Sequence, residues 1–286
     1  MKGKNNPSSE LAVTAGIELA GAKVSTRKRK FNLFSWIVLA IGLTYFFLPL
    51  FATFEFSLRM IKGKYSFEAY RVAFSDPRFF QEFGYSLLWS ALTILFSLLL
   101  VVPTAYWVHL RLKRIRPVVE FITLMPFVVP AVVLVFGMLR VYGRYYFMVR
   151  WPILLIAGYV IISLPYMFRA VDAGLRAIDV PTLTEAAQSL GAGWGTILFR
   201  VIFPNLRVAI LSGVFLTFAI VMGEFTFAAL LVWKAFGPYM EEIGSMRAYT
   251  PQALSVVSFL LTWISIALIQ RIARGAPGQV QMAGGR

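Results

Sequence analysis

Residues 84–108 read GYSLLWSALTILFSLLLVVPTAYWV and contain no charged side chain. A helix rises 1.5 Å per residue, so about 20 apolar residues cross the roughly 30 Å of hydrocarbon in a bilayer. This run is longer than that limit. It therefore predicts a helix that spans a membrane.

Similar apolar runs recur on both sides of this stretch. They lie near 33–54, 118–142, 151–171, 206–233 and 251–272. Pro126 and Pro130 interrupt the second of these runs, and Pro165 lies in the third. Such prolines need neighbouring helices or polar groups to satisfy the backbone carbonyls that they free. The pattern predicts an all-α fold, a polytopic membrane helix bundle of about six transmembrane helices.

Composition agrees with a bilayer as the solvent. The chain of 286 residues is 59% hydrophobic and 14% charged, whereas soluble domains average about 45–50% and about 25%. There is no cysteine and one histidine, His109. A clustered Cys and His metal site is therefore excluded, and a Ser-His-Asp triad would have to use His109. We expect no catalytic residue, no metal site and no cofactor bound by this chain.

The basic residues indicate the topology. The net charge is +15, but Lys and Arg fall in short runs between the apolar segments, a pattern typical of membrane topology rather than of nucleic-acid binding. With both termini in the cytoplasm, 18 Lys and Arg residues lie on the inner side and 10 on the outer side. We expect a cytoplasmic N-terminal tail at 1–30, a transmembrane domain at 31–274 and a cytoplasmic C-terminal tail at 275–286.

The longest inner loop, 172–204, reads DAGLRAIDVPTLTEAAQSLGAGWGTILFRVIFP. Thr182 to Glu185 fit the S/T-x-x-E capping box, with Thr182 as the N-cap and Glu185 reaching back to its amide. Pro181 is expected to stop any helix that arrives from upstream. The loop therefore predicts a short helix that begins just after Thr182.

The same loop also predicts where this helix ends. Gly191 stands where a glycine commonly closes a helix, and a second short helix is expected from Trp194 to a point before Pro204. Ala186, Ala187 and Gly191 carry little side-chain bulk. Together they would form a surface that a partner protein can approach closely.

The spacing in this loop resembles the EAA loop of the permease subunits of binding-protein-dependent ABC importers. The resemblance covers roughly residues 84–272, with Phe203 where the family often has leucine. It rests on Glu185-Ala186-Ala187, Gly191, Val201 and Pro204, on Pro165-Tyr166, Leu175 and Ile178 ahead of them, and on Gly223-Glu224-Phe225 in the apolar run at 206–233. It implies that 31–274 is a transmembrane permease domain in a bacterial inner membrane.

The resemblance also implies a mechanism and partners. In this family the short helix seats in a groove on a cytoplasmic ATPase subunit, a second permease subunit completes a hetero- or homodimer in the lipid, and an extracytoplasmic solute-binding protein delivers the solute. By this analogy the coupling residues are Glu185, Ala186, Ala187, Gly191 and Pro204; the alternative is that they only cap and end a loop helix.

The ATP-binding machinery is expected on another chain. No G-x-x-x-x-G-K-[ST] sequence occurs, and the nearest fragment, Gly63-Lys64, lacks the earlier glycine. ATP and Mg would therefore be bound by the partner ATPase, and this chain would be a transporter subunit rather than an enzyme.

Glu224 is predicted to lie well inside the apolar run at 206–233. An acidic side chain at that depth costs free energy on insertion, so it usually faces a cavity or a partner group. It would either line the translocation path of a cationic solute or make a structural contact between helices. Glu120 and His109, near the inner ends of spans, are interpreted as interfacial residues.

Two other function classes remain open from the residues alone. An ATP-independent secondary transporter or channel would leave the EAA pattern unexplained and would want more intramembrane ionisable groups or an inverted repeat. An intramembrane enzyme would need a nucleophile and a base that this sequence hardly offers. The short outer loops and the Gly223-Glu224-Phe225 segment resemble permeases for polyamines, ferric iron, phosphonates and small oxyanions more than sugar permeases. This resemblance favours a small charged, polyamine-like solute.

Overall fold

The structure is a computed structural model that describes residues 33–274. The tails expected at 1–30 and 275–286 lie outside the described residues. Within the described part, the regular elements are all helices, apart from one isolated β-bridge between Ile61 and Lys64. The expected all-α class is therefore confirmed. Contacts divide the chain into two compact units, with the boundary between Leu50 and Phe51.

The first unit contains the start of α2, Leu33–Ser57. Residues Trp36–Ser57 are long and apolar enough to cross a membrane. Pro49 lies inside this helix without ending it. The span predicted at 33–54 is thus observed as a single helix.

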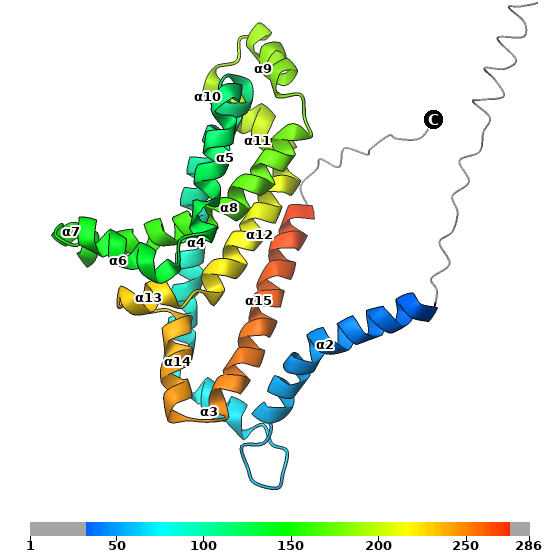
Figure 1. Ribbon diagram of the computed structural model, residues 1–286, viewed down its shortest axis with the longest axis vertical. Helices are drawn as coiled ribbons and strands as arrows, with labels where there is room; N and C mark the ends of the chain where they lie inside the picture. The colour runs from blue at the N-terminus through cyan, green and yellow to red at the C-terminus, as the bar shows by residue number, and fades with distance from the viewer. Residues whose placement is uncertain (1–32, 275–286) are drawn as a thin grey trace, which may run out of the picture. The chain divides into compact units, whose positions relative to one another are not determined.

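Three helices form the centre of the second unit (Figure 1). They are α4 (Pro77–Leu110), α8 (Ile153–Arg176) and α12 (Arg207–Gly223), which pack against one another, while α15 (Thr250–Arg274) packs beside α12. Among the described residues, α2, α4, α8 and α15 each qualify alone as a membrane span. The 34 residues of α4 make a helix of about 51 Å, so it extends beyond the hydrocarbon at one end or both.

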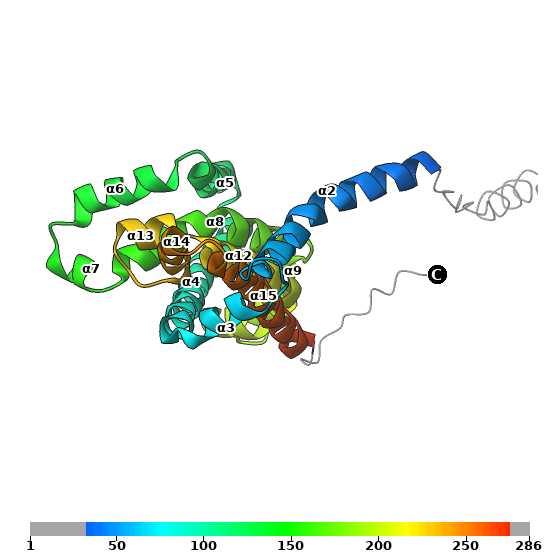
Figure 2. The same ribbon diagram turned by 90° about the horizontal axis from the view of Figure 1, so that it is seen from below.

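The third predicted span is bent. Its first arm comprises η1 (Lys113–Ile115), α5 (Arg116–Leu124) and η2 (Met125–Phe127), and its second arm is α6 (Ala131–Tyr142), turned by 104°. Pro126 lies in η2 and Pro130 directly precedes α6, so the two prolines mark the corner as expected. Figure 2 shows α6 extending sideways from this corner, with α13 (Thr226–Leu230) between α6 and α14 (Phe236–Met246). The short α7 (Tyr146–Arg150) leads on to α8.

The fifth predicted span is bent as well. The segment Trp194–Asn205 consists of α10 (Trp194–Thr196), the π-helical η3 (Ile197–Ile202) and α11 (Phe203–Asn205), and it meets α12 at 79°. The span placed at 206–233 ends instead at Gly223. The described residues thus hold four single membrane helices, or six spans if each bent pair counts as one.

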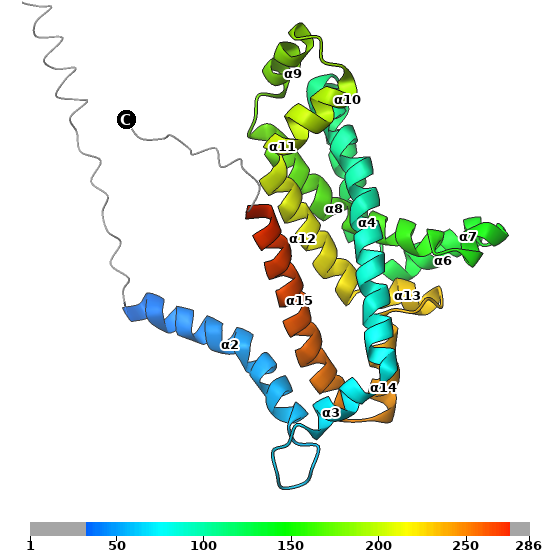
Figure 3. The same ribbon diagram turned by 180° about the vertical axis from the view of Figure 1, so that it is seen from behind.

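Short helices cover the two ends of the central helices (Figures 1 and 3). α9 (Val180–Ser189) and α10 lie at one end, which we call the α9 end. α3 (Glu68–Ser75) and α14 lie at the opposite end, called the α14 end. The two ends therefore carry different folded surfaces.

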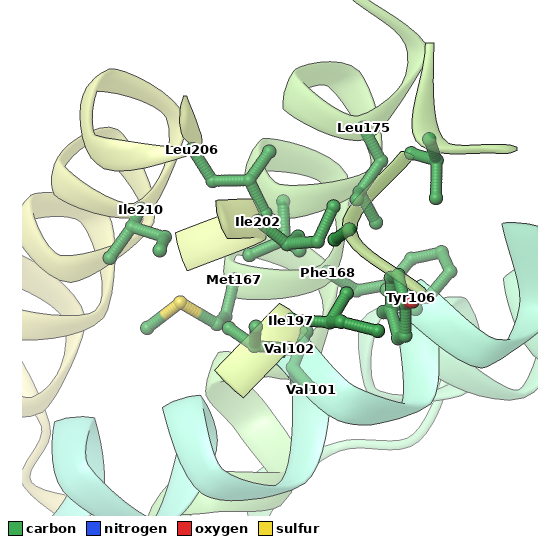
Figure 4. Close-up of a cluster of buried hydrophobic side chains, with 14 residues drawn as sticks. Val101, Val102, Tyr106, Met167, Phe168, Leu175, Ile197, Ile202, Leu206 and Ile210 are labelled. Carbon is green, nitrogen blue, oxygen red and sulfur yellow. The ribbon is translucent and has the colours of Figure 1, made fainter. Parts of the chain in front are cut away.

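The core at the α9 end joins four segments (Figure 4). Val101, Val102 and Tyr106 of α4 meet Phe168 of α8 and side chains of the 197–210 segment. The buried members of this cluster also include Met167, Val171, Leu175, Val180, Ala187, Ile197, Ile202, Leu206 and Ile210. Because Val180 and Ala187 belong to α9, the loop helix is part of the core and not a loose appendage.

The α8–α12 contact is made close to the backbone. A Cβ atom placed on Gly174 of α8 would lie 2.4 Å from the Cβ of Ala209 and 3.0 Å from Cδ2 of Leu206. Gly213 of α12 lies likewise against Met167 of α8. These two helices therefore approach more closely than any larger residue at Gly174 would permit.

Candidate functional site

The helix α9 begins earlier than its sequence predicted. Asp179 is the N-cap: its carboxylate accepts hydrogen bonds from the backbone N–H of Thr182 at 3.3 Å and from the Thr182 hydroxyl at 2.7 Å. Pro181 lies in the first turn, where its missing N–H costs nothing. The prediction of Thr182 as N-cap, with Glu185 bonding back to it and Pro181 as a stop, is therefore wrong.

The Thr182 hydrogen bonds also hold the pKa of Asp179 below its ordinary value of 3.8. A carboxylate with a lowered pKa stabilises the fold above the unfolded-state value, and that contribution is lost as the pH falls through the lowered value. The cap of α9 is thus formed throughout the neutral pH range.

The end of α9 is formed by Gly191, as expected. Gly191 has φ of +78°. The N–H of Gly191 donates to the carbonyl of Gln188 at 2.8 Å, and that of Ala192 donates to the carbonyl of Ala187 at 3.0 Å. This pair of bonds is the Schellman arrangement, which needs a left-handed residue at this position.

One face of α9 is fixed and the other is free. Thr184 and Ala187 are buried, and the hydroxyls of Thr184 and Tyr106 share a buried hydrogen bond of 3.0 Å that ties α9 to α4. Glu185 and Ala186 are exposed on the opposite face. In the described residues the Glu185 carboxylate has no hydrogen bond or ion pair, so its charge is available to a partner.

The small-residue surface predicted for the loop needs one correction. Ala186 and Gly191 are exposed, but Ala187 is 8% exposed and packs into the core. The exposed apolar side chains near them are Leu190, 88% exposed, and Trp194, 41% exposed. The free surface of the loop therefore combines Glu185, Ala186 and Gly191 with two apolar neighbours.

Pro204 lies inside the second helical segment and not after it. The segment that begins at Trp194 continues through Pro204 to Asn205 before the bend into α12. Pro204 has no N–H to donate to a preceding carbonyl, and it lies just after the π-helical turn Ile197–Ile202. The expected end before Pro204 is thus wrong, and Pro204 marks the corner between two helices.

A charged cluster that sequence reasoning missed lies at the α9 end. Asp172 of α8, 9% exposed at its side chain, is 3.0 Å from the guanidinium of Arg116, 2.6 Å from that of Arg176 and 3.4 Å from Nε2 of His109. Glu120 accepts from both Arg116 and Arg176 at 3.0 Å. We call these five residues the Asp172 cluster.

The Asp172 cluster holds α5 against α8. Within α5 itself only Thr123 is buried, and the exposed side chains of this helix include Val118, Phe121 and Ile122. The ion pairs therefore attach α5 together with Val119, which packs against the core at the α9 end. Glu120 and His109, interpreted from the sequence as interfacial residues, both belong to this attachment.

Glu224 does not lie within a span. It follows the last residue of α12 and is half-buried, and its two carboxylate oxygens accept from the backbone N–H groups of Thr226 at 2.7 Å and Phe227 at 2.9 Å. Glu224 directly precedes Phe225, the N-cap residue of α13, and its carboxylate satisfies N–H groups in the first turn of that helix, as a capping side chain does. The predicted position inside the fifth span is wrong because the chain leaves α12 at Gly223 and starts α13.

Comparison with known proteins identifies the family. Residues 101–275 match the family described as "Binding-protein-dependent transport system inner membrane component", a stretch of more than half the chain that includes α8, α9 and α12. The chain belongs to this family. The resemblance drawn from the loop spacing is thereby confirmed, and the chain is a multi-pass inner-membrane protein.

Curated relatives are similar over part of their length. The spermidine/putrescine transport system permease protein PotB of Salmonella typhimurium is 27% identical over 172 residues, covering 54% of this chain and 60% of the relative. The methionine import system permease protein MetP of Bacillus subtilis is 31% identical over 107 residues, covering 37% and 48%. The chain thus spans less than two thirds of the length of these relatives.

A solved structure supports the fold. A chain from a bacterial ABC transporter involved in the import of the acidic polysaccharide alginate aligns with a TM-score of 0.62 at 14% identity, covering 85% of this chain and 96% of that one. At this identity the likeness concerns the fold alone. This helix bundle therefore shares the fold of that transporter chain.

Proposed function

We propose that this chain is the transmembrane permease subunit of an ATP-driven, binding-protein-dependent importer. The observation that carries the proposal is α9, a helix anchored in the core on one face and open on the other, within the region that matches the family. A partner that binds the open face can move α4 and α8 through that anchor. An ATP-independent transporter or channel would have no use for such a helix.

The open face of α9 is proposed as the seat for a cytoplasmic ATPase subunit. Glu185 supplies a free carboxylate, Ala186 and Gly191 permit close approach, and Ala187 supports the helix from below by packing into the core. Pro204 sits at the corner that leads from this region into α12. ATP and Mg would be bound by the ATPase and not by this chain.

The remaining partners and the orientation follow from the same proposal. A second permease subunit, identical or homologous, would complete the path in the lipid, and an extracytoplasmic binding protein would deliver the solute. The excess of Lys and Arg on the inner side supports cytoplasmic termini in a bacterial inner membrane. A reporter that is active only outside the cytoplasm, fused after Arg286, should stay inactive.

The solute is proposed to be a small organic cation of the polyamine type. This rests on the spermidine/putrescine system named for one relative and on the acidic side chains Glu224 and Glu82 in the described chain. Relatives named for other solutes, such as the methionine import system permease protein, support the general importer mechanism equally well. The polyamine class therefore needs its own test.

The test is assembly and uptake. Tagged chain purified from its native membrane should carry an ATPase chain and a second permease, which native mass spectrometry can count. Vesicles holding this complex should accumulate labelled putrescine only with ATP and the binding protein. Uptake by the chain alone, without ATP, would establish the ATP-independent alternative; ATP-driven uptake of another solute would refute only the polyamine assignment.

Replacing Glu224 separates its two candidate roles. Glu224→Ser keeps a side-chain acceptor for the N–H groups of α13 but removes the charge, whereas Glu224→Leu removes both. If the residue acts as a cap, uptake should stay within about threefold for Ser and fall further for Leu, because losing a cap costs about 1 kcal/mol. Equal loss in both variants, with normal membrane insertion, would indicate that the charge itself lines the solute path.

A further inference from the structure

At the α14 end, a stripe of residues on one face of α4 makes hydrogen bonds and an ion pair to the segment 231–246, which runs from the end of α13 to the end of α14. Arg78 makes a two-pronged ion pair with Glu242, with N–O distances of 2.8 and 2.5 Å. The Ser86 hydroxyl accepts from the N–H of Phe236 at 2.8 Å. These positions are four residues on either side of Glu82, and therefore lie on one face of the helix.

One more bond continues this stripe. The indole N–H of Trp89, a further turn along α4, donates to the carbonyl of Lys234 at 2.9 Å. The tip of the fastened segment is Val232, which has φ of +56° and is 90% exposed. Val232 is the left-handed residue that ends α13: its N–H donates to the carbonyl of Ala229 at 3.2 Å, and the N–H of Trp233 donates to the carbonyl of Ala228 at 2.9 Å.

Glu82 lies in the middle of the stripe and has no such bond. Its residue is 6% exposed, and in the described chain its carboxylate makes no hydrogen bond and no ion pair within 4.0 Å. Lys234 and Arg78 act on it only through space. Since Arg78 is already neutralised by Glu242, Glu82 is a buried acid without a bonded counter-charge, which is unfavourable unless a cation reaches it.

A hollow of about 280 Å³ gives access to this carboxylate. It is lined by Glu82, by the Arg78–Glu242 pair, by Lys234 and by the aromatic side chains of Trp233 and Tyr239. The face of Tyr239 is covered by the guanidinium of Arg78, 5.4 Å from the ring centre. Trp233 is half-buried, packs edge-to-face with Trp89 at 5.9 Å between ring centres, and is the second aromatic side chain that lines the hollow.

We propose that this hollow binds one primary ammonium group of an organic cation, with Glu82 as the counter-ion and Trp233 as the aromatic wall. A metal ion fits less well: Ca²⁺ and Mg²⁺ want about six or more oxygen ligands, and the described residues contain no group of three metal-binding side chains. The proposal rests on the importer function above, because it places a cation site at the end where the solute would enter.

The test uses the purified full chain in lipid nanodiscs with 1,4-diaminobutane as the probe and 1,4-butanediol as the uncharged analogue. Calorimetry should show binding of the diamine and none of the diol. Glu82→Gln should weaken the diamine by about tenfold or more, and Trp233→Leu by less, since a cation–π contact is weaker than a charge pair. Glu68→Gln, which removes a half-buried acid of α3 outside the hollow, is the matched control and should bind as wild type.

Lys234 provides the discriminating variant. If the hollow is a ligand site, Lys234→Met removes a competing cation and should leave diamine binding equal or tighter. If Lys234 is instead the intended partner of Glu82, the variant should unfold at lower temperature and the diamine should not bind to wild type at all, which would overturn the proposal. Equal affinity in wild type and Glu82→Gln would overturn it as well.

These outcomes are independent of the ATPase. ATP-driven uptake of solute would support the importer function. If the Glu82→Gln variant then bound the diamine as well as wild type does, only the proposed site at Glu82 would be refuted. If the chain never associates with an ATPase, the importer proposal is refuted, but the calorimetric test of Glu82 remains valid.

Discussion

A chain carrying Gly191→Val is expected to insert into the membrane and yet to lose most of its coupling to ATP hydrolysis. The φ of Gly191 is +78°. A residue with a Cβ raises the conformational free energy there by about 1–2 kcal/mol, and a β-branched residue raises it more. No atom lies within 4 Å of the added Cβ, so the strain falls on the end of α9 and not on the core.

The expected size follows from that strain. If about 1–2 kcal/mol is taken from docking of the ATPase, the docked population falls by roughly 5- to 30-fold. Solute uptake in vesicles and the stimulation of ATP hydrolysis by the binding protein should both fall to that extent, with insertion checked by blot. Unchanged uptake would mean that the loop is a passive connector.

Two controls separate strain from bulk. Gly191→Asn places a residue that tolerates positive φ at the same site and should retain most activity. Gly193→Val adds the same bulk at a position with φ of −75° and should be nearly silent. Loss of activity with Gly193→Val would instead indicate that side-chain volume near the partner decides the effect. Glu185→Ala should uncouple without strain, because Glu185 makes no side-chain contact that holds the fold.

The largest loss of stability is expected from Asp172→Asn. The side chain of Asp172 is 9% exposed and meets two arginines, so removing its charge leaves two guanidinium groups with Glu120 as their shared acceptor. Breaking a buried ion pair costs about 3–5 kcal/mol. Because Arg116 and Arg176 are 27% and 55% exposed, solvent screens part of this, and we expect about 2–3 kcal/mol.

Two measurements check the Asp172 prediction. The temperature of thermal unfolding in nanodiscs should fall relative to wild type. Glu68→Gln breaks a pair within α3 whose arginine, Arg71, is 78% exposed, and should leave that temperature unchanged. The chain has no cysteine, so a single spin label on Phe121→Cys reports on α5 alone. Its spectrum should become more mobile with Asp172→Asn. An identical spectrum and unfolding temperature would show that α5 is held by other contacts.

The membrane architecture could be predicted from the sequence because apolar length is a local property. Four predicted spans are single helices, and the corner at Pro126 and Pro130 was marked by the prolines themselves. Gly191 was also predictable, since a glycine after a run of helix formers ends a helix by its own conformation. Each of these signals lies within the element that it shapes.

The errors arose where two local patterns compete. Asp179 and Thr182 can both cap α9, and Pro181 suits either the first turn of a helix or the residue after one. The structure selects Asp179, because Thr182 then donates twice to its carboxylate. Glu224 posed a similar ambiguity: an acid in an apolar run is interpreted as intramembrane unless the helix is known to end just before it.

The Asp172 cluster could not be predicted from spacing. Arg116 lies 56 positions from Asp172 along the chain, and the sequence of α5 does not indicate which residue of α8 will pair with Arg116. Only the packing of α4, α5 and α8 brings the five side chains together. Glu82 is the same kind of case, because its isolation becomes visible only after its neighbours on α4 have found their partners.

The closeness of α8 and α12 limits how this lineage can vary. A methyl group added at Gly174 would lie 2.4 Å from the Cβ of Ala209, so even alanine would force the two helices apart. The hollow beside Glu82 is under no such steric limit. Substitutions can therefore enlarge or reduce side chains around the hollow without disturbing the contact between α8 and α12.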